Sequence, residues 1–128
     1  MKPACLLLFA LACQPVLAAV DDFDTKLAKA RENLASEAGA AYDRKLGLAM
    51  QALPALVPAM KDCATRHPEQ QDVHGYFEFT AGAPYRVVLR PASPYAGCLE
   101  KALSGHDVPA PPQLPWYNHF LFATDPAG

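Results

Sequence analysis

The chain has 128 residues, a formal net charge of −2 at pH 7 and a hydrophobic fraction of 52%. Its 11 basic residues are scattered rather than gathered into a stripe, so nucleic acid is not an expected partner. A chain of this length is expected to form one domain, large enough to fold alone and small enough for a covalent cross-link to matter.

Residues 1–19 have the pattern of an export signal. Lys2 supplies a positive charge, Leu6–Ala12 forms an apolar run, and residues 16–18 fit the small-x-small cleavage rule. The run is shorter than the roughly 20 residues that a bilayer span needs. We therefore predict cleavage after Ala18 or Ala19 and a periplasmic mature protein without a membrane span, while secretion out of the cell stays open.

Cleavage would remove Cys5 and Cys13 and leave Cys63 and Cys98 in the mature chain. A lipoprotein acylated at Cys13 fits poorly, because the bulky Leu11 stands two positions before it. An even number of cysteines in a small exported protein usually forms a structural disulfide, and no Cys-x-x-Cys pattern indicates redox or metal chemistry. We therefore predict a disulfide between the two remaining cysteines, which would contribute about 3 to 4 kcal/mol on the chain-entropy model.

Apolar residues recur at a spacing of three and four from Asp22 to Leu53, which predicts one long helix that ends at Pro54. Gly39 and Gly47 would each weaken it by about 1 kcal/mol, so a bend near either is expected. At about 1.5 Å per residue, this helix is longer than a domain of this size can cover. Part of it should project, lie along a sheet, or pair with another copy as a homodimer.

A second helix is predicted from Pro54 or Ala55 to Arg66, and it carries Cys63 on its apolar face. Two alternating segments follow, His74–Thr80 and Tyr85–Arg90, and the Gly-containing turn between them predicts a β-hairpin. Phe77 and Phe79 should share one face of the first strand.

Ser93 and Pro94 have the pattern of an N-cap and first residue of a further helix, which should end at Gly105. A proline-rich connector then leads to a last strand, Trp116–Ala123.

The order of these segments is distinctive. It consists of Cys63, the strand-turn-strand at 75–89, the helix at 98–103, the proline step at 108–112 and the strand at 118–122. Over residues 60–124 this order resembles the C-terminal domain of TonB-type periplasmic proteins, in the cysteine-bridged form called AgmX/PglI-like. The resemblance implies an α+β fold, in which two N-terminal helices precede a ββαβ domain with an antiparallel sheet.

The resemblance also implies a binding module that offers a sheet edge to a strand of a partner. In TonB-type transducers, an uncleaved membrane anchor and a long proline-rich spacer precede a domain of this kind. Here the expected anchor is cleavable, and an Ala-rich helix stands in place of the spacer. Force transmission from the inner membrane is therefore not expected. We divide the chain into a signal at 1–19, a helical region at 20–66 and the ββαβ region at 67–128.

No catalytic, cofactor or metal motif is present in the sequence. The histidines of the mature chain are His67, His74, His106 and His119. No two of them have the i, i+4 spacing that places a pair of metal ligands on one helix face, and positions at helix ends or on a strand surface account for them. Glu69, Asp72 and Glu78 cluster near the hairpin, where solvated carboxylates are the simpler interpretation and a hydrolase with an unrecognised site is a weaker alternative.

The candidate partner-binding residues are aromatic or amphipathic side chains of the predicted strands, namely Tyr76, Trp116, Tyr117 and His119. Tyr and Trp dominate interface hot spots, although burial under the helices is an equal alternative. We expect a non-catalytic periplasmic module that binds another envelope or exported protein. The alternative is a small inhibitor or immunity protein that blocks an exported enzyme.

Overall fold

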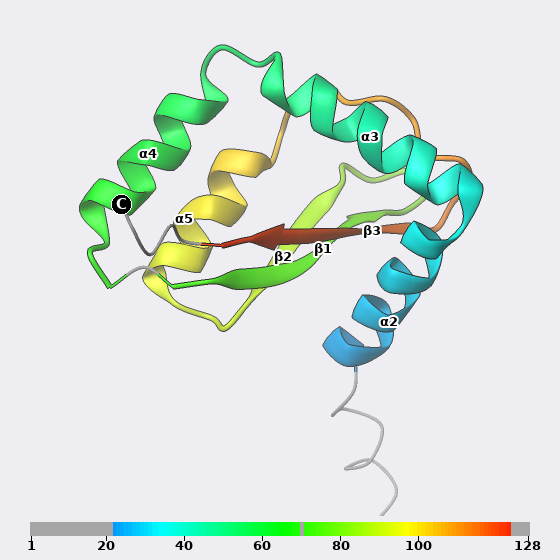
Figure 1. Cartoon of the computed structure of the whole chain (residues 1–128), viewed down its shortest axis with the longest axis horizontal. Helices are drawn as coiled ribbons and strands as arrows, with labels where there is room; N and C mark the ends of the chain where they lie inside the picture. Colours follow the sequence, from blue (N-terminus) through cyan, green and yellow to red (C-terminus); the bar gives the residue numbers. More distant parts are fainter. Residues whose placement is uncertain (1–21, 70, 124–128) are drawn as a thin grey trace, which may run out of the picture.

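The computed structural model describes residues 22–69 and 71–123, and in this part of the chain four helices surround a three-stranded antiparallel sheet (Figure 1). The elements are α2 Asp22–Ala35, α3 Glu37–Gln51, α4 Leu56–Arg66, β1 Val73–Phe79, β2 Arg86–Arg90, α5 Pro94–Leu103 and β3 Trp116–Phe122. The predicted α+β fold is therefore confirmed. The predicted export signal, residues 1–19, lies outside the described residues.

The long β1 strand occupies the centre of the sheet, in the order β2-β1-β3. Tyr76 in β1 lies opposite Val88 in β2 and His119 in β3, which fixes the register of both pairs. Because side chains alternate along each strand, this register gathers one set of residues on each face of the sheet. Both strands of the hairpin are thus where the alternation in the sequence predicts them.

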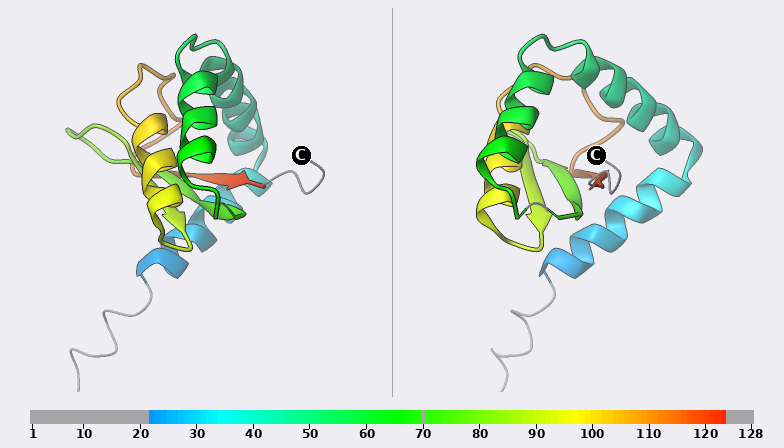
Figure 2. Two further views of the ribbon diagram at one scale, coloured as in Figure 1. Left: turned by 90° about the vertical axis from the view of Figure 1, so that its left-hand side faces the viewer. Right: turned by 60° about the vertical axis from the view of Figure 1, so that its left-hand side comes forward.

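Helices α3, α4 and α5 cover the first face of the sheet. Phe77 and Leu89 point to this side and pack with Leu46, Leu99 and Leu103 in the main core. In Figure 2, α4 and α5 run side by side over the sheet, and the contacts between their residues agree. This core surrounds the disulfide and holds the hairpin between the helices.

The second face of the sheet is covered by α2. Leu27 and Ala30 of this helix form a smaller core with Tyr76, against which Val88 and Tyr117 also pack. Helices therefore pack against both faces of the sheet.

The helix predicted from Asp22 to Leu53 is two helices, because the chain turns sharply at Ser36, close to the bend expected near Gly39. The extended backbone of Ser36 (φ −80°, ψ 156°) starts a new helix, and its hydroxyl accepts the N–H of Gly39 at 3.0 Å. A Cβ at Gly39 would overlap the carbonyl oxygen of Asn33, so this close corner requires glycine. The turn lets α2 lie along the sheet instead of projecting.

The shorter elements follow the prediction closely. Pro58 lies in the first turn of α4, where a missing N–H has little cost. The hydroxyl of Ser93 accepts the N–H of Ala96 at 3.0 Å and Pro94 is the first residue of α5. Helix α5 ends at Leu103, and its C-cap is Ser104 instead of the predicted Gly105. Gly105 follows with a positive φ of 77°.

Candidate functional site: the open edge of β3 and the adjoining groove

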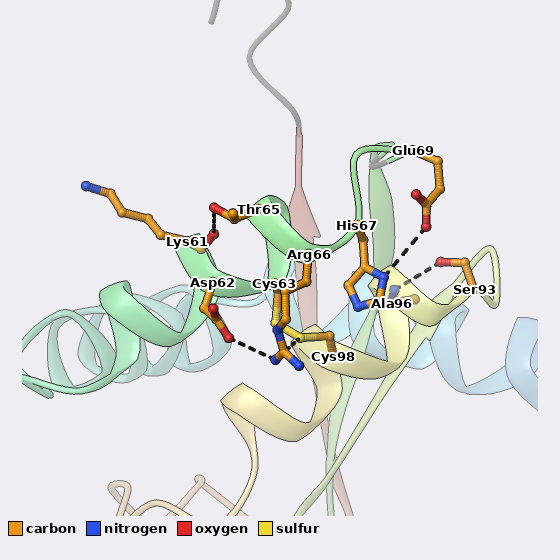
Figure 3. The surroundings of a disulfide bond; sticks show 10 residues. All are labelled: Lys61, Asp62, Cys63, Thr65, Arg66, His67, Glu69, Ser93, Ala96 and Cys98. Atoms are coloured by element: carbon orange, nitrogen blue, oxygen red, sulfur yellow. Dashed lines mark hydrogen bonds and ion pairs between the residues drawn. A yellow bond between two sulfur atoms is a disulfide. The ribbon is translucent and has the colours of Figure 1, made fainter.

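The predicted disulfide between Cys63 and Cys98 is present and joins α4 to α5, with their Cα atoms 5.7 Å apart. Cys63 is 1% exposed, so the bond is anchored in the core. Figure 3 shows the guanidinium of Arg66 beside the bond, where it lies 3.7 Å from Sγ of Cys98 and pairs with Asp62 at 2.9 Å. The bond holds the helix before the hairpin against the helix after it.

A buried carboxylate links α2 to the second face of the sheet. Glu78 is 7% exposed, and its two oxygens pair with Nζ of Lys26 at 2.8 Å and with Nε of Arg86 at 3.4 Å. The hydrogen bond with Glu78 raises the pKa of Lys26 above 10.5, although partial burial opposes the shift. One oxygen of Glu78 therefore holds α2 against the sheet, and the other pairs with Arg86 of the neighbouring strand β2.

The remaining predicted polar residues have structural surroundings. The ring of His67 faces Glu69 at 3.6 Å in the loop before β1 (Figure 3). The ring of His74 packs edge-on against Phe23, and His106 bonds the carbonyl of Ala102 at 2.8 Å. Within 22–69 and 71–123, no group of three or more His, Cys, Asp or Glu side chains is arranged to hold a metal ion.

The four candidate partner-binding residues divide into two pairs. Tyr76 and Trp116 are only 1% and 3% exposed. Tyr76 packs against Phe23 and Tyr117, so burial, the alternative given above, accounts for both residues. Tyr117 and His119 are half-buried on β3. Burial, together with the positive charge of Arg31, lowers the pKa of His119 below 6.5, so its ring is neutral at pH 7.

Side chains occupy the outer edge of β2 at Leu89. The N–H of Leu89 donates to Oε2 of Glu100 at 2.8 Å, and its carbonyl accepts from the guanidinium of Arg90 at 3.0 Å. In an antiparallel ladder the N–H and C=O of one residue point to the same side, so the groups of Leu89 face away from β1. Both are therefore occupied at the middle of this edge.

The outer edge of β3 differs from that of β2. The same alternation turns the backbone groups of Tyr117, His119 and Leu121 away from β1. The carbonyl of Tyr117 accepts from Nδ2 of Asn33 in α2 at 2.9 Å, and that of His119 has a long 3.5 Å contact with the amide of Asn118. The Leu121 side chain is 62% exposed. The edge is thus closed by α2 at Tyr117, whereas no side chain of the described residues bonds the outward backbone groups of Leu121.

An apolar groove adjoins this edge on the first face of the sheet, between α3, α4 and β3. Its volume is about 330 Å³. The residues that line it are Asp43, Leu46, Gly47, Met50, Gln51, Leu56, Val57, Met60, Phe77, Leu103, Asn118, His119, Phe120 and Phe122. The sequence gives no signal for the groove, because these residues come from five elements, α3, α4, β1, α5 and β3, which only the fold brings together.

Polar groups meet at one side of the groove. Nδ2 of Asn118 donates to a carboxylate oxygen of Asp43 at 2.9 Å, and Oδ1 of Asn118 accepts from the indole N–H of Trp116 at 3.3 Å. The amide of Asn118 is buried, so these two bonds satisfy a polar group that would otherwise be costly there. The bond from Asn118 also fixes the position of the Asp43 carboxylate in the lining of the groove.

Comparison of the chain with protein-family models, with curated proteins and with solved structures found no match. In the described part of the chain, none of the helices has the length and apolar character that a membrane crossing needs.

Proposed function

We propose that this protein is a non-catalytic binding module of the bacterial envelope, which takes up a strand of another envelope or exported protein at the edge of β3. The supporting observation is the difference between the two edges of the sheet. Side chains occupy the outward groups of Leu89 in β2, whereas β3 is open toward Leu121. An added strand gains affinity from main-chain hydrogen bonds with such an edge.

The resemblance to TonB C-terminal domains supports the same mode of binding and suggests a periplasmic partner. Export by a cleavable signal at residues 1–19 is part of the proposal. An intramolecular disulfide is compatible with it, because such bonds persist in oxidising compartments.

The decisive variant is Leu121→Pro, compared with Leu121→Ala. The N–H of Leu121 faces away from β1, so proline there costs no bond within the sheet, but it removes a donor that an added strand would use. Alanine removes the exposed side chain and keeps the donor. The tagged protein would be used to capture partners from envelope extract, with quantification by mass spectrometry.

We expect a partner that the wild-type protein and Leu121→Ala recover and that Leu121→Pro loses by tenfold or more, with thermal unfolding curves showing that all three are folded. Equal recovery with all three would refute binding at this edge, and no specific partner with the wild-type protein would refute the binding module. A captured enzyme that is inhibited by the protein would favour the inhibitor alternative.

A further inference from the structure

We propose that the groove between α3, α4 and β3 binds a small molecule, namely a free single-chain amphiphile with a cationic or neutral head group. This site is separate from the open backbone edge of β3, and no motif in the sequence indicates it. Four properties of the groove lead to this ligand: its lining, its depth, its size and its single charged group.

The lining is almost entirely apolar and flexible in shape. Met50 in α3, Met60 in α4, and Phe120 and Phe122 in β3 all belong to this lining. Methionine side chains are unbranched and adapt to the shape of a bound chain, so two of them suit a ligand without a rigid outline. Val57, also in the lining, is 51% exposed, which leaves the groove open to solvent at α4.

The groove reaches from this opening into the main core. Phe77 and Leu103 contribute to its lining although each is 2% exposed. A chain lying on this floor would exchange part of its contact with water for contact with the apolar core, which is the driving force for binding an apolar ligand. A shallow surface patch would not provide such burial.

The size of the groove sets the number of chains. Its volume of about 330 Å³ lies at the lower end of the range of about 300 to 1,000 Å³ found for small-molecule sites. This favours one unbranched chain over a two-chain lipid.

Asp43 determines which head group is favoured. Among the described residues that line the groove, Asp43 is the one acidic or basic residue apart from His119. Nδ2 of Asn118 donates to its carboxylate at 2.9 Å and holds it in place. His119 also lines the groove and carries no charge at pH 7, because its pKa is lowered by burial. A cationic head beside the carboxylate gains Coulomb energy, whereas an anionic head is repelled.

The test uses the neutral fluorescent probe N-phenyl-1-naphthylamine with the purified protein. Alkyltrimethylammonium ions and alkanoates of matched chain length then compete with the probe, all below their micelle concentrations. We expect saturable binding of one probe per protein. Each added methylene should tighten competition about fourfold until the groove is full. The ammonium series should compete about fivefold better than the alkanoates at low salt.

Gly47→Leu is the variant that fills the groove. A Cβ at Gly47 meets no atom within 4 Å, so a leucine there can occupy the space of the ligand without a backbone clash. Gly97→Leu in α5 is the matched control, since it also replaces a helical glycine with open space around it, outside the groove. We expect Gly47→Leu to weaken probe binding tenfold or more and Gly97→Leu to leave it unchanged.

Two further variants separate the head group and the β3 edge from the apolar site. Asp43→Asn keeps an oxygen that can accept the Asn118 amide, and it should abolish the preference for the cation while the neutral probe still binds. Leu121→Pro should bind the probe as the wild-type protein does, whatever its effect on partner capture. The two proposals can therefore fail independently.

Absence of saturable binding would overturn the inference, and so would equal binding by Gly47→Leu and Gly97→Leu. Equal competition by ammonium ions and alkanoates would refute the role of Asp43. Binding to phosphatidylcholine vesicles in place of the monomeric ions would mean that the groove meets a membrane surface, which also contradicts the proposal.

Discussion

At Gly75, in the middle of the central strand, the backbone of β2 occupies the space of a side chain. A Cβ at this position would overlap the carbonyl oxygen of Val88. Because backbone atoms cannot rotate away as a long side chain can, the pairing of β1 with β2 depends on this glycine. The sequence shows Gly75 at the start of an alternating strand and gives no indication of this close approach.

We predict that Gly75→Ala lowers the free energy of unfolding by about 1 to 3 kcal/mol, as expected for overpacking a well-packed interior. Urea unfolding followed by circular dichroism would measure the change. Gly97→Ala is the control, because open space surrounds Gly97 on the exposed side of α5. This second substitution should raise stability by about 0.5 to 1 kcal/mol. Similar values for the two variants would contradict the assignment.

At the scale of the elements, α4 and α5 depend on the disulfide for their mutual position. Cys63 and Cys98 are separated by 35 residues, and the loop that they close contains the entire hairpin. The cross-link therefore removes conformations from the unfolded chain while it fixes the two helices over the first face of the sheet.

We predict that replacing both cysteines with serine lowers the free energy of unfolding by about 3 to 4 kcal/mol. The wild-type protein in a reducing buffer should show a similar loss, measured as a lower urea midpoint. The α-helical signal in circular dichroism should persist at low denaturant, since the bond stabilises the fold and performs no chemistry. An unchanged midpoint under reducing conditions would show that the bond does not stabilise the protein.

At the scale of the whole molecule, buried tyrosines connect the helices, the sheet and the connector. The hydroxyl of Tyr42 in α3 donates to the carbonyl of Pro109 at 2.7 Å, and that of Tyr85 donates to Leu103 at 2.6 Å. Burial raises the pKa of Tyr42 to about 12 and also raises the pKa values of Tyr76, Tyr85 and Tyr95 above 10.0. The folded protein therefore resists ionisation of these groups.

We predict that the free energy of unfolding is steady between about pH 8 and pH 10 and falls as the pH rises above about 10. Above the ordinary tyrosine pKa the unfolded chain ionises while the folded chain does not, so the unfolded state is favoured. The raised pKa of Lys26 acts in the same direction, because its pair with Glu78 is lost when the amine is deprotonated.

Urea midpoints between pH 8 and pH 11 would measure this fall, and absorbance at 295 nm would report tyrosinate. Tyr42→Phe is the comparison. It loses the bond to Pro109, which should cost about 1 kcal/mol at neutral pH, and it should then show a shallower decline. Parallel declines of the two proteins would mean that Tyr42 does not take part.

The sequence by itself determined the features that depend on neighbouring residues. The alternation in the hairpin predicts the faces of β1 and β2, and Ser93 with Pro94 marks the start of α5. The even cysteine count predicts the bond between Cys63 and Cys98. Each of these signals is local or arises from the chemistry of a single residue type, so no knowledge of the packing is needed.

Only the tertiary structure decided how α2 and α3 are arranged and which surfaces stay free. The helical periodicity continues through Ser36, and the turn there follows from a close contact between Asn33 and Gly39 that the periodicity does not show. The open edge of β3 and its groove depend on contacts between α2, α3, α4 and β3, whose residues are distant in sequence. Burial and exposure of this kind are set by the complete packing, because the same apolar residue can serve the core or line a groove.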